Sequence, residues 1–261
     1  MKKVIACLLA VAFVLMMGAC GGKTSKLDEV KAAGKLVVAT SPDFPPFEYL
    51  DGTNVIGIEV DIMEKICADL GVKLELAQMD FDSVLTGIAA NKYDIGMSGI
   101  TVDEDRKKNS LFTDPYCLAA QAIVVIEGST IKGKADLDGK KVSAQTGTTA
   151  EKFTMSNGYQ VSSFAANSDA EMALVTGKVD AWVIDDLTAA EMVAAYNAEN
   201  ETKLVILDEA MTTEPYAFAT ALGNDDLIAA INESLQKLLA DGTVKATFEK
   251  YNAPYTAPSA N

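Results

Sequence analysis

Short apolar segments alternate with amphipathic segments along almost the whole chain. Residues 35–40 form an apolar run that predicts a strand, while the apolar residues of 59–70 recur every three or four positions and predict a helix. The same alternation predicts further strands at 93–97, 121–126, 141–144, 179–184 and 204–207, and further helices at 81–91, from 148, from a capping box at 168–171, at 187–196, at 225–240 and up to 251. This strand–helix order favours an α/β fold with largely parallel sheets.

The 261 residues include no histidine. Histidine is the usual general base at neutral pH and the commonest metal ligand, so its absence removes Ser-His-Asp and Cys-His catalysis from consideration. The formal charge of -15, from 37 acidic and 22 basic residues, argues against nucleic acid as a partner, because phosphate binding needs clustered Lys and Arg. The same acidity would equally serve solubility alone. Binding, with no metal and no cofactor, is therefore favoured over catalysis.

The N-terminus has the pattern of a secretory signal peptide, with basic residues 2–3 before an apolar run over 4–17 that is short for a membrane span. Residues 15–20, which end in Gly18-Ala19-Cys20, resemble the lipobox of bacterial lipoproteins, in which cleavage precedes a lipid-modified cysteine. Met17 stands where that motif usually has Leu, and cleavage that leaves Cys20 unmodified is the alternative. We expect a signal peptide at 1–19, a tether at 20–26, and an extracytoplasmic lipoprotein anchored to the cell membrane by lipid, such as palmitate, on Cys20.

Removal of the signal peptide would leave Cys67 and Cys117 as the free thiols besides Cys20. A disulfide between them is one option in an oxidising compartment. Cys67 falls on the apolar face of a predicted helix, and Cys117 falls just before a predicted strand. Two separate buried thiols are therefore the favoured prediction.

Eight short motifs follow one another between residues 27 and 251. They are 40–48 (TSPDFPPFE), 57–61 (GIEVD), 81–85 (FDSVL), 97–101 (MSGIT) with Arg106, 112–116 (FTDPY), 145–150 (QTGTTA), 179–181 (VDA) with Asp185, and 241–243 (DGT). Each motif is weak alone. As an ordered set they resemble the bacterial extracellular solute-binding proteins of family 3, the polar amino-acid family that includes lysine/arginine/ornithine- and glutamine-binding proteins.

The resemblance implies a type II periplasmic-binding-protein fold, in which two α/β lobes are joined by two hinge crossings and trap the ligand in the cleft between them. Carried over to this sequence, lobe 1 comprises 27–117 and 216–252, and lobe 2 comprises 122–207. The hinges fall at 118–121 and 208–215, and 253–261 form a tail. Each lobe is expected to contain a mostly parallel sheet flanked by helices.

A free amino acid presents a carboxylate and an ammonium, so its site needs a fixed cation, oriented N–H donors and a fixed anion. The guanidinium of Arg106 can hold a carboxylate with two hydrogen bonds, although from the residues alone it could equally pair with a neighbouring surface acid. Its place five residues after Thr101 matches the family's carboxylate-binding arginine. The resemblance adds Thr101, Thr148 and Thr149 as carboxylate ligands, the last two at a helix start. Capping by Thr101 and Thr148 is the structural alternative.

The resemblance also implies that the ligand ammonium meets Asp185, Gly99 and Thr101. Asp185 and Asp186 end a predicted strand, where adjacent side chains point to opposite faces, so only one of them should enter the cleft. We expect Asp185 in the cleft and Asp186 as a cap for the helix that begins at Leu187.

The residues that the resemblance implies around the ligand side chain are Phe44, Phe81, Ser41, Gln145 and Ile184. Ser41 stands where members that contact a lysine-type cation have aspartate, and Gln145 stands where a glutamine binder has lysine. Because Ser41 carries no negative charge at this position, the sequence favours a neutral polar L-amino acid as the ligand. A cationic ligand stays open, because Asp43 or Glu48 could supply the missing charge.

The function implied by the resemblance is the extracytoplasmic substrate-binding component of an amino-acid ABC transporter, a monomer that delivers its ligand to permease subunits in the membrane. A dehydratase-type enzyme, a receptor and an adhesin on the same scaffold are the alternatives. A dehydratase would need a proton donor in the cleft besides Asp185. A receptor would need a signalling module, of which the sequence after residue 251 gives no sign.

Overall fold

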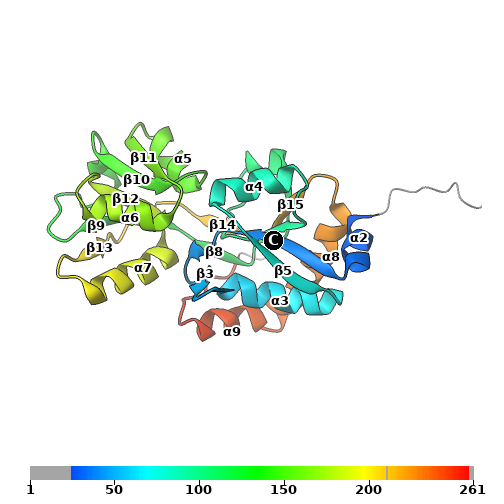
Figure 1. The fold of residues 1–261 in the computed structure, drawn as a ribbon. Coiled ribbons are helices and arrows are strands. Elements are labelled where there is room, and N and C mark those ends of the chain that lie inside the picture. Colours follow the sequence, from blue (N-terminus) through cyan, green and yellow to red (C-terminus); the bar gives the residue numbers. More distant parts are fainter. Residues whose placement is uncertain (1–24, 210, 259–261) are drawn as a thin grey trace, which may run out of the picture.

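The computed structural model describes residues 25–209 and 211–258, and Figure 1 shows that they form two lobes side by side. The predicted signal peptide at 1–19 and the predicted lipidation site at Cys20 lie outside the described residues. Within the described ranges, no helix is both long enough and apolar enough to cross a membrane.

The first lobe is built on a five-stranded sheet. Its strands lie in the order β5 (Lys73–Gln78), β1 (Lys35–Thr40), β6 (Ile95–Gly96), β15 (Ala219–Ala221) and β7 (Ser110–Phe112). The helices of this lobe are α2 (Lys26–Ala33), α3 (Ile58–Leu70), α4 (Phe81–Ala89), α8 (Asp225–Ala240) and α9 (Thr243–Lys250). Gly34 and Gly71 end α2 and α3 in the left-handed conformation, which a residue without a Cβ adopts readily.

The second lobe is built on a sheet of the same size. Its strands lie in the order β11 (Gln160–Phe164), β10 (Lys141–Gln145), β12 (Ala181–Asp185), β9 (Gln121–Ile126) and β13 (Leu204–Ile206). The helices of this lobe are α5 (Thr149–Ser156), α6 (Asn167–Val175) and α7 (Asp186–Glu199). Two 3-10 turns, η1 (Arg106–Lys108) and η2 (Lys134–Leu137), belong to the first and second lobes respectively.

Both sheets are mixed, but four of the five strands in each run in the same direction and one runs opposite to them. The strand–helix alternation predicts the three adjacent parallel strands, which are β5, β1 and β6 in one sheet and β11, β10 and β12 in the other. The fourth strand, β15 or β9, is antiparallel to both of its neighbours. These two strands directly follow the crossings between the lobes, so the chain enters each sheet from the side of the other lobe and not through a helix.

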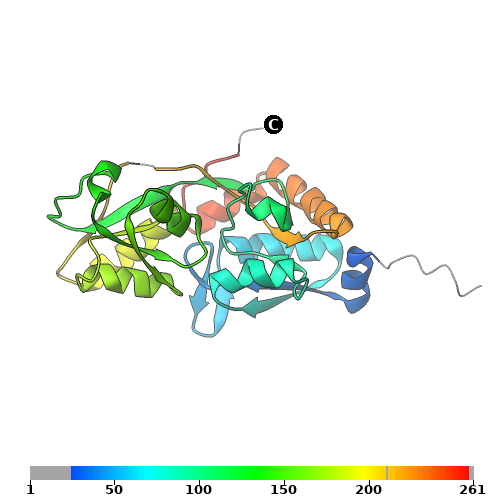
Figure 2. The same cartoon turned by 90° about the horizontal axis from the view of Figure 1, so that it is seen from above.

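Two paired antiparallel strands, β8 (Cys117–Ala119) and β14 (Glu214–Tyr216), connect the lobes. These strands overlap residues 118–121 and 208–215, and Figure 2 shows the connecting segments between the lobes. The residues predicted to be a tail pack against this connection as far as they are described. The Leu118 N–H donates to the Thr256 carbonyl at 2.9 Å, and the Tyr255 hydroxyl donates to the Tyr116 carbonyl at 3.2 Å.

A small antiparallel sheet is inserted between β1 and α3, with strands β2 (Asp43–Phe44), β3 (Glu48–Asp51) and β4 (Asn54–Ile56). Its anchor is Phe47, which is fully buried. The Phe47 ring lies 5.1 Å from the ring of Tyr216 in β14 and 5.9 Å from that of Phe248 in α9. The insertion is therefore fixed against the hinge, and it carries Phe44 to the cleft.

Cys67 in α3 and Cys117 in β8 are separate, buried, free thiols, which confirms that prediction. Burial raises the pKa of the Cys67 thiol to about 11, so this group is not a reactive thiolate at neutral pH. Burial raises the pKa of Cys117 as well. Both cysteines therefore act as small apolar residues.

The capping box predicted at 168–171 is wrong. Helix α6 begins at Asn167, and Ala166 occupies the cap position without a side-chain hydrogen bond. The Asn167 N–H donates instead to the Asp43 carboxylate at 2.9 Å. The Asp43 carboxylate of the first lobe thus accepts the hydrogen bond that a local cap residue would otherwise accept.

Candidate ligand-binding site

A cleft lies between the lobes, and the space free of protein atoms in and at the mouth of this cleft is about 410 Å³, open solvent included. Every predicted ligand residue except Ser41 lines it: Phe44, Phe81, Gly99, Thr101, Arg106, Gln145, Thr148, Thr149, Ile184 and Asp185. In both lobes these residues sit where strands end and helices begin. That edge is where open α/β sheets bind ligands.

Arg106 is the cation of the cleft. It begins η1, where the Asp103 carboxylate accepts hydrogen bonds from the N–H groups of Asp105 and Arg106, both at 2.8 Å. The guanidinium donates to the Thr101 carbonyl at 2.9 Å and, across the cleft, to the Gly147 carbonyl at 3.1 Å. Burial lowers the pKa of Arg106, but a guanidinium stays charged at neutral pH. Two of its five N–H donors are used in these bonds, which leaves donors for a carboxylate.

The threonines divide between capping and lining. Thr148 is the N-cap of α5: its hydroxyl accepts from the Glu151 N–H at 3.1 Å and donates to the Gln145 carbonyl at 2.7 Å. Thr149 follows as the first residue of α5, at a helix N-terminus whose dipole favours an anion. Thr101 does not cap the turn after it, because Asp103 does so. Thr101 thus lines the cleft, and its carbonyl orients Arg106.

Asp185 is the acidic side chain that the second lobe presents to the cleft. It ends β12 and accepts a short hydrogen bond from the Tyr216 hydroxyl. Burial, reinforced by the nearby charge of Glu214, raises the pKa of Asp185 to about 8, although the Tyr216 hydrogen bond acts in the opposite direction. Asp186 points the other way, and its carboxylate accepts from the Leu187 N–H at 2.8 Å and the Ala120 N–H at 3.3 Å. The two side chains therefore lie on opposite faces, as predicted. The expected cap at Asp186 is wrong, because α7 (Asp186–Glu199) begins at Asp186 itself and Asp185 occupies the cap position.

Two phenylalanines and a glycine shape the first lobe's wall of the cleft. The Arg106 guanidinium lies 5.6 Å from the centre of the Phe81 ring, which favours a cation–π contact. The Phe44 ring stacks on Phe47 at 5.6 Å. Gly99 has a φ of 53°, and a Cβ there would come within 2.5 Å of the Phe44 ring. Only glycine therefore allows the loop after β6 to pass beneath Phe44.

Ser41 does not line the cleft, and Asp43 does. The Ser41 hydroxyl donates to the Asp43 carboxylate at 3.0 Å, so it supports that side chain from below. Across the cleft, Gln145 Nε2 donates to Asp43 at 2.9 Å. Burial raises the pKa of Asp43, while hydrogen bonds from Asn167, Ser41 and Gln145 oppose the shift. Ser41 thus stands behind Asp43 rather than on the cleft surface, and its contact with the ligand stays a prediction.

Asn167 lines the cleft although the sequence did not single it out. Its side chain donates to Gln145 Oε1 at 3.0 Å, while its backbone N–H donates to Asp43. Asn167 begins α6 after β11, as Thr149 begins α5 after β10. Its place at a strand-to-helix junction is the signal that would have found it.

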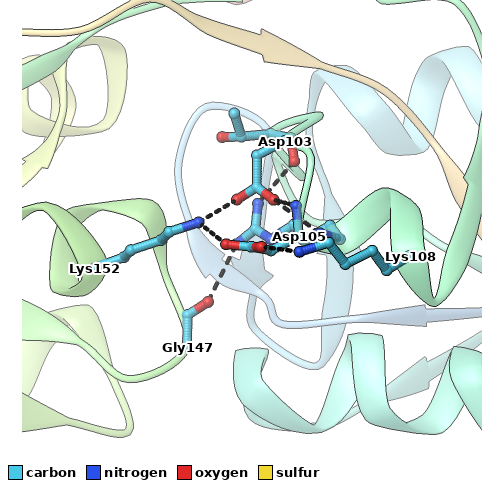
Figure 3. Close-up of polar contacts among 7 residues, drawn as sticks. Asp103, Asp105, Lys108, Gly147 and Lys152 are labelled. Atoms are coloured by element: carbon cyan, nitrogen blue, oxygen red, sulfur yellow. Dashed lines mark hydrogen bonds and ion pairs between the residues drawn. The ribbon is translucent and has the colours of Figure 1, made fainter.

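Charged side chains also join the lobes outside the cleft. Figure 3 shows Lys152 of α5 directed at Asp103 and Asp105 of the first lobe. Lys152 Nζ lies 3.6 Å from Asp103 and closer still to Asp105, which also pairs with Lys108 at 2.7 Å. These pairs are solvent-exposed, so each contributes little alone. Among the described residues, no group of three metal-ligating side chains occurs.

The chain matches the family model described as bacterial extracellular solute-binding proteins, family 3, over residues 36–254. The chain belongs to this family. The two-lobed α/β fold is that of the type II periplasmic binding proteins, as the sequence predicts.

Individual amino-acid-binding proteins are also similar to this chain. The chain is 30% identical over 230 residues to the L-cystine-binding protein TcyJ of Escherichia coli, covering 86% of this chain and 85% of that protein. It is 27% identical to the arginine-binding extracellular protein ArtP of Bacillus subtilis, covering 96% and 98%. Among solved structures, a mutant of ArgBP from T. maritima is 37% identical with a TM-score of 0.81, covering 87% of this chain and 98% of that one.

Proposed function

We infer that this protein captures a free amino acid between its lobes as the substrate-binding component of an amino-acid ABC transporter. The observation that carries this function is a basic and an acidic side chain that face one cleft from different lobes, Arg106 from the first and Asp185 from the second. The guanidinium suits the ligand carboxylate, and the carboxylate suits the ligand ammonium. Membership of family 3 and similarity to cystine- and arginine-binding proteins support the same function.

Closure of the lobes makes the two charges act together. In an open form, water screens Arg106 and Asp185, and each holds its end of the ligand weakly. Closure expels this water, so both pairings strengthen at once. The binding energy of the ligand then shifts the open–closed equilibrium toward the closed form.

The charge balance of the cleft favours a cationic amino acid. The ionisable side chains among the lining residues are Asp43, Arg106 and Asp185, two acidic and one basic. A zwitterionic ligand satisfies Arg106 and Asp185 and leaves Asp43 without a cation. A carboxylate accepts about four hydrogen bonds, and Asp43 receives three, from Ser41, Gln145 and Asn167. We therefore propose L-arginine as the first candidate, with a neutral polar amino acid such as L-glutamine as the alternative.

Calorimetric titration with the twenty L-amino acids tests both parts of this function. We expect binding of one or a few amino acids with dissociation constants of about 1 μM or tighter, about −8 kcal/mol, with L-arginine ahead of L-glutamine. Sugars and divalent metals should give no heat. Mass spectrometry of the recovered ligand separates binding from the dehydratase alternative, since a new product would establish an enzyme. Silence toward all amino acids would contradict the function.

Anchoring by lipid and delivery to permease subunits complete the proposed function. We propose that Cys20 carries the lipid and that a monomer presents the closed, loaded lobes to the transporter. Cys20→Ser should release the protein from the membrane fraction while leaving its amino-acid affinity unchanged. If the variant stays with the membrane, the lipid anchor is wrong even though the binding function stands.

A further inference from the structure

Two glutamates are completely buried behind the cleft. Glu48 begins β3 in the inserted sheet, and Glu59 lies in the first turn of α3. The titratable groups that act on this pair from neighbouring elements are Asp43, Tyr116 and Cys117. Among the described residues, no ion pair includes either glutamate. Two adjacent buried carboxylates without a cation would be strongly destabilising.

The hydrogen bonds of the two carboxyl groups are unequal. Glu59 accepts from the Gly99 N–H at 3.0 Å on one oxygen and from the Tyr116 hydroxyl at 2.6 Å on the other. Glu48 accepts from the Ser98 hydroxyl at 2.8 Å on Oε1 alone. Its Oε2 is buried and meets no donor within the described part of the chain. An ionised Glu48 would thus leave one charged oxygen without a hydrogen bond.

A proton on Glu48 Oε2 resolves this deficit, because the oxygen then becomes a donor. Glu59 is the acceptor within reach. Burial, reinforced by the charge of Glu59, raises the pKa of Glu48 well above its ordinary value. Burial also raises the pKa of Glu59, but hydrogen bonds from Glu48, Tyr116 and Gly99 act in the opposite direction. Glu48 is therefore the neutral partner and Glu59 the ionised one.

We propose that Glu48 and Glu59 hold one proton between them and act as positioning residues, which fix the Ser98–Gly99 peptide for the ligand ammonium. Ser98 and Gly99 both line the cleft, and one glutamate holds each of them from behind. A trans peptide places its N–H and C=O on opposite sides. Because the Gly99 N–H points at Glu59, the Ser98 carbonyl points away from Glu59 and is free to accept from an ammonium.

Two glutamine variants separate the role of Glu48 as the neutral partner from that of Glu59 as the ionised partner. The affinity measurements in this test rest on the proposed function. In Glu48→Gln the carboxamide donates to Glu59 and still accepts from Ser98, so we expect this variant to lose clearly less L-arginine affinity than Glu59→Gln. In Glu59→Gln only one side-chain oxygen remains to accept from Gly99 or Tyr116. We expect that variant to bind L-arginine about tenfold or more weakly, with faster hydrogen exchange of the Gly99 amide.

The proton itself is measured without ligand. An infrared difference spectrum of wild type minus Glu48→Gln at pH 7 should show the carbonyl stretch of a protonated carboxylic acid. Absence of that band would overturn the shared proton, and so would equal loss of affinity in Glu48→Gln and Glu59→Gln. If Glu59→Gln does not fold, the infrared band and the L-arginine affinity of Glu48→Gln still decide whether the two glutamates share a proton. Failure of wild type to bind any amino acid would refute the proposed function and leave the infrared result standing.

Discussion

The strand order β5-β1-β6-β15-β7 of the first lobe matches the order β11-β10-β12-β9-β13 of the second, position by position. In both lobes a strand–helix–strand–helix–strand segment makes the parallel half of the sheet, and the strand that follows a crossing is antiparallel in fourth place. The chain, however, builds the second lobe from one continuous segment and closes the first with residues that follow the second crossing.

The lobes differ in what stands between the first strand and the first helix. In the second lobe β10 leads through a short turn into α5, and the cleft meets helix starts directly at Thr149 and Asn167. In the first lobe the inserted sheet occupies this place and brings Asp43, Phe44 and Glu48. The two lobes share one strand order. The second lobe contributes the helix starts at Thr149 and Asn167 to the cleft, and the first lobe contributes an inserted sheet that is rich in carboxyl groups. The chemistry of the site comes from the junctions and not from the sheets.

The largest expected effect tests whether both lobes hold the ligand. Arg106→Ala and Asp185→Ala should each weaken L-arginine binding by about 2–5 kcal/mol, or roughly 30- to several-thousand-fold, because each leaves a ligand charge desolvated and unpaired. Calorimetry measures the affinity, and the melting temperature of the ligand-free variants checks the fold. The matched control is Asp186→Ala, whose side chain accepts from the Leu187 and Ala120 N–H groups outside the cleft and should leave affinity nearly unchanged. A loss of affinity in only one of the two variants would contradict the claim that both lobes hold the ligand.

The inserted sheet should set the preference for a cation. Asp43→Asn removes the negative charge but keeps an oxygen for the donors of Ser41, Gln145 and Asn167. Since a hydrogen bond to a charged group contributes about 1.5–3 kcal/mol, L-arginine affinity should fall about ten- to hundredfold. L-glutamine affinity should change by less than about threefold. Equal losses for both amino acids would show that Asp43 acts only in holding the lobes together.

The second lobe should make binding depend on pH. With the lobes in contact and no ligand bound, burial raises the pKa of Asp185 to about 8, and an ammonium needs the carboxylate form, so binding below pH 8 releases a proton. Affinity should therefore rise as pH rises, by about five- to tenfold between pH 6.5 and 7.5. Titrations in buffers of different ionisation enthalpy count the released proton. Asp185→Asn should abolish the dependence, and a dependence that survives in this variant would assign it to another group.

The smallest effect concerns the ion pairs that join the lobes. Lys152→Ala removes the contacts with Asp103 and Asp105, and we expect L-arginine affinity to fall by about two- to threefold, less at high salt. Dissociation followed by stopped flow should account for most of the change. Lys237→Ala is the matched control, because that lysine pairs with Glu233 within α8. An equal effect from the control would assign the change to net charge alone.

Local patterns in the sequence predicted most elements and the cleft-facing acid. Apolar periodicity located α3 and α8, and strand alternation assigned opposite faces to Asp185 and Asp186. These features depend on neighbours a few residues away. Arg106, Gly99 and Phe81 needed the ordered motifs as well, because nothing local distinguishes an arginine in a cleft from one on the surface.

Contacts between distant segments were the part that the sequence did not reveal. Asp43 is held by Gln145 and Asn167, 102 and 124 positions away, so its entry into the cleft depends on how the lobes meet. The antiparallel places of β9 and β15 depend on where the crossings enter each sheet. The contact between Thr256 and β8 gives no periodic signal in a short Pro/Ala-rich segment. The repeated strand order likewise leaves no repeat in the sequence, since equivalent positions carry different side chains.

Modified ligands test most directly whether one amino acid is held at both of its charged ends. Calorimetry with L-arginine, L-arginine methyl ester and Nα-acetyl-L-arginine keeps the protein unchanged and removes one ligand charge at a time. We expect both derivatives to bind at least about 30-fold more weakly than L-arginine, the ester because Arg106 loses its carboxylate and the acetyl derivative because Asp185 loses its ammonium. A derivative that binds as tightly as L-arginine would contradict the bridging of the two lobes by the ligand.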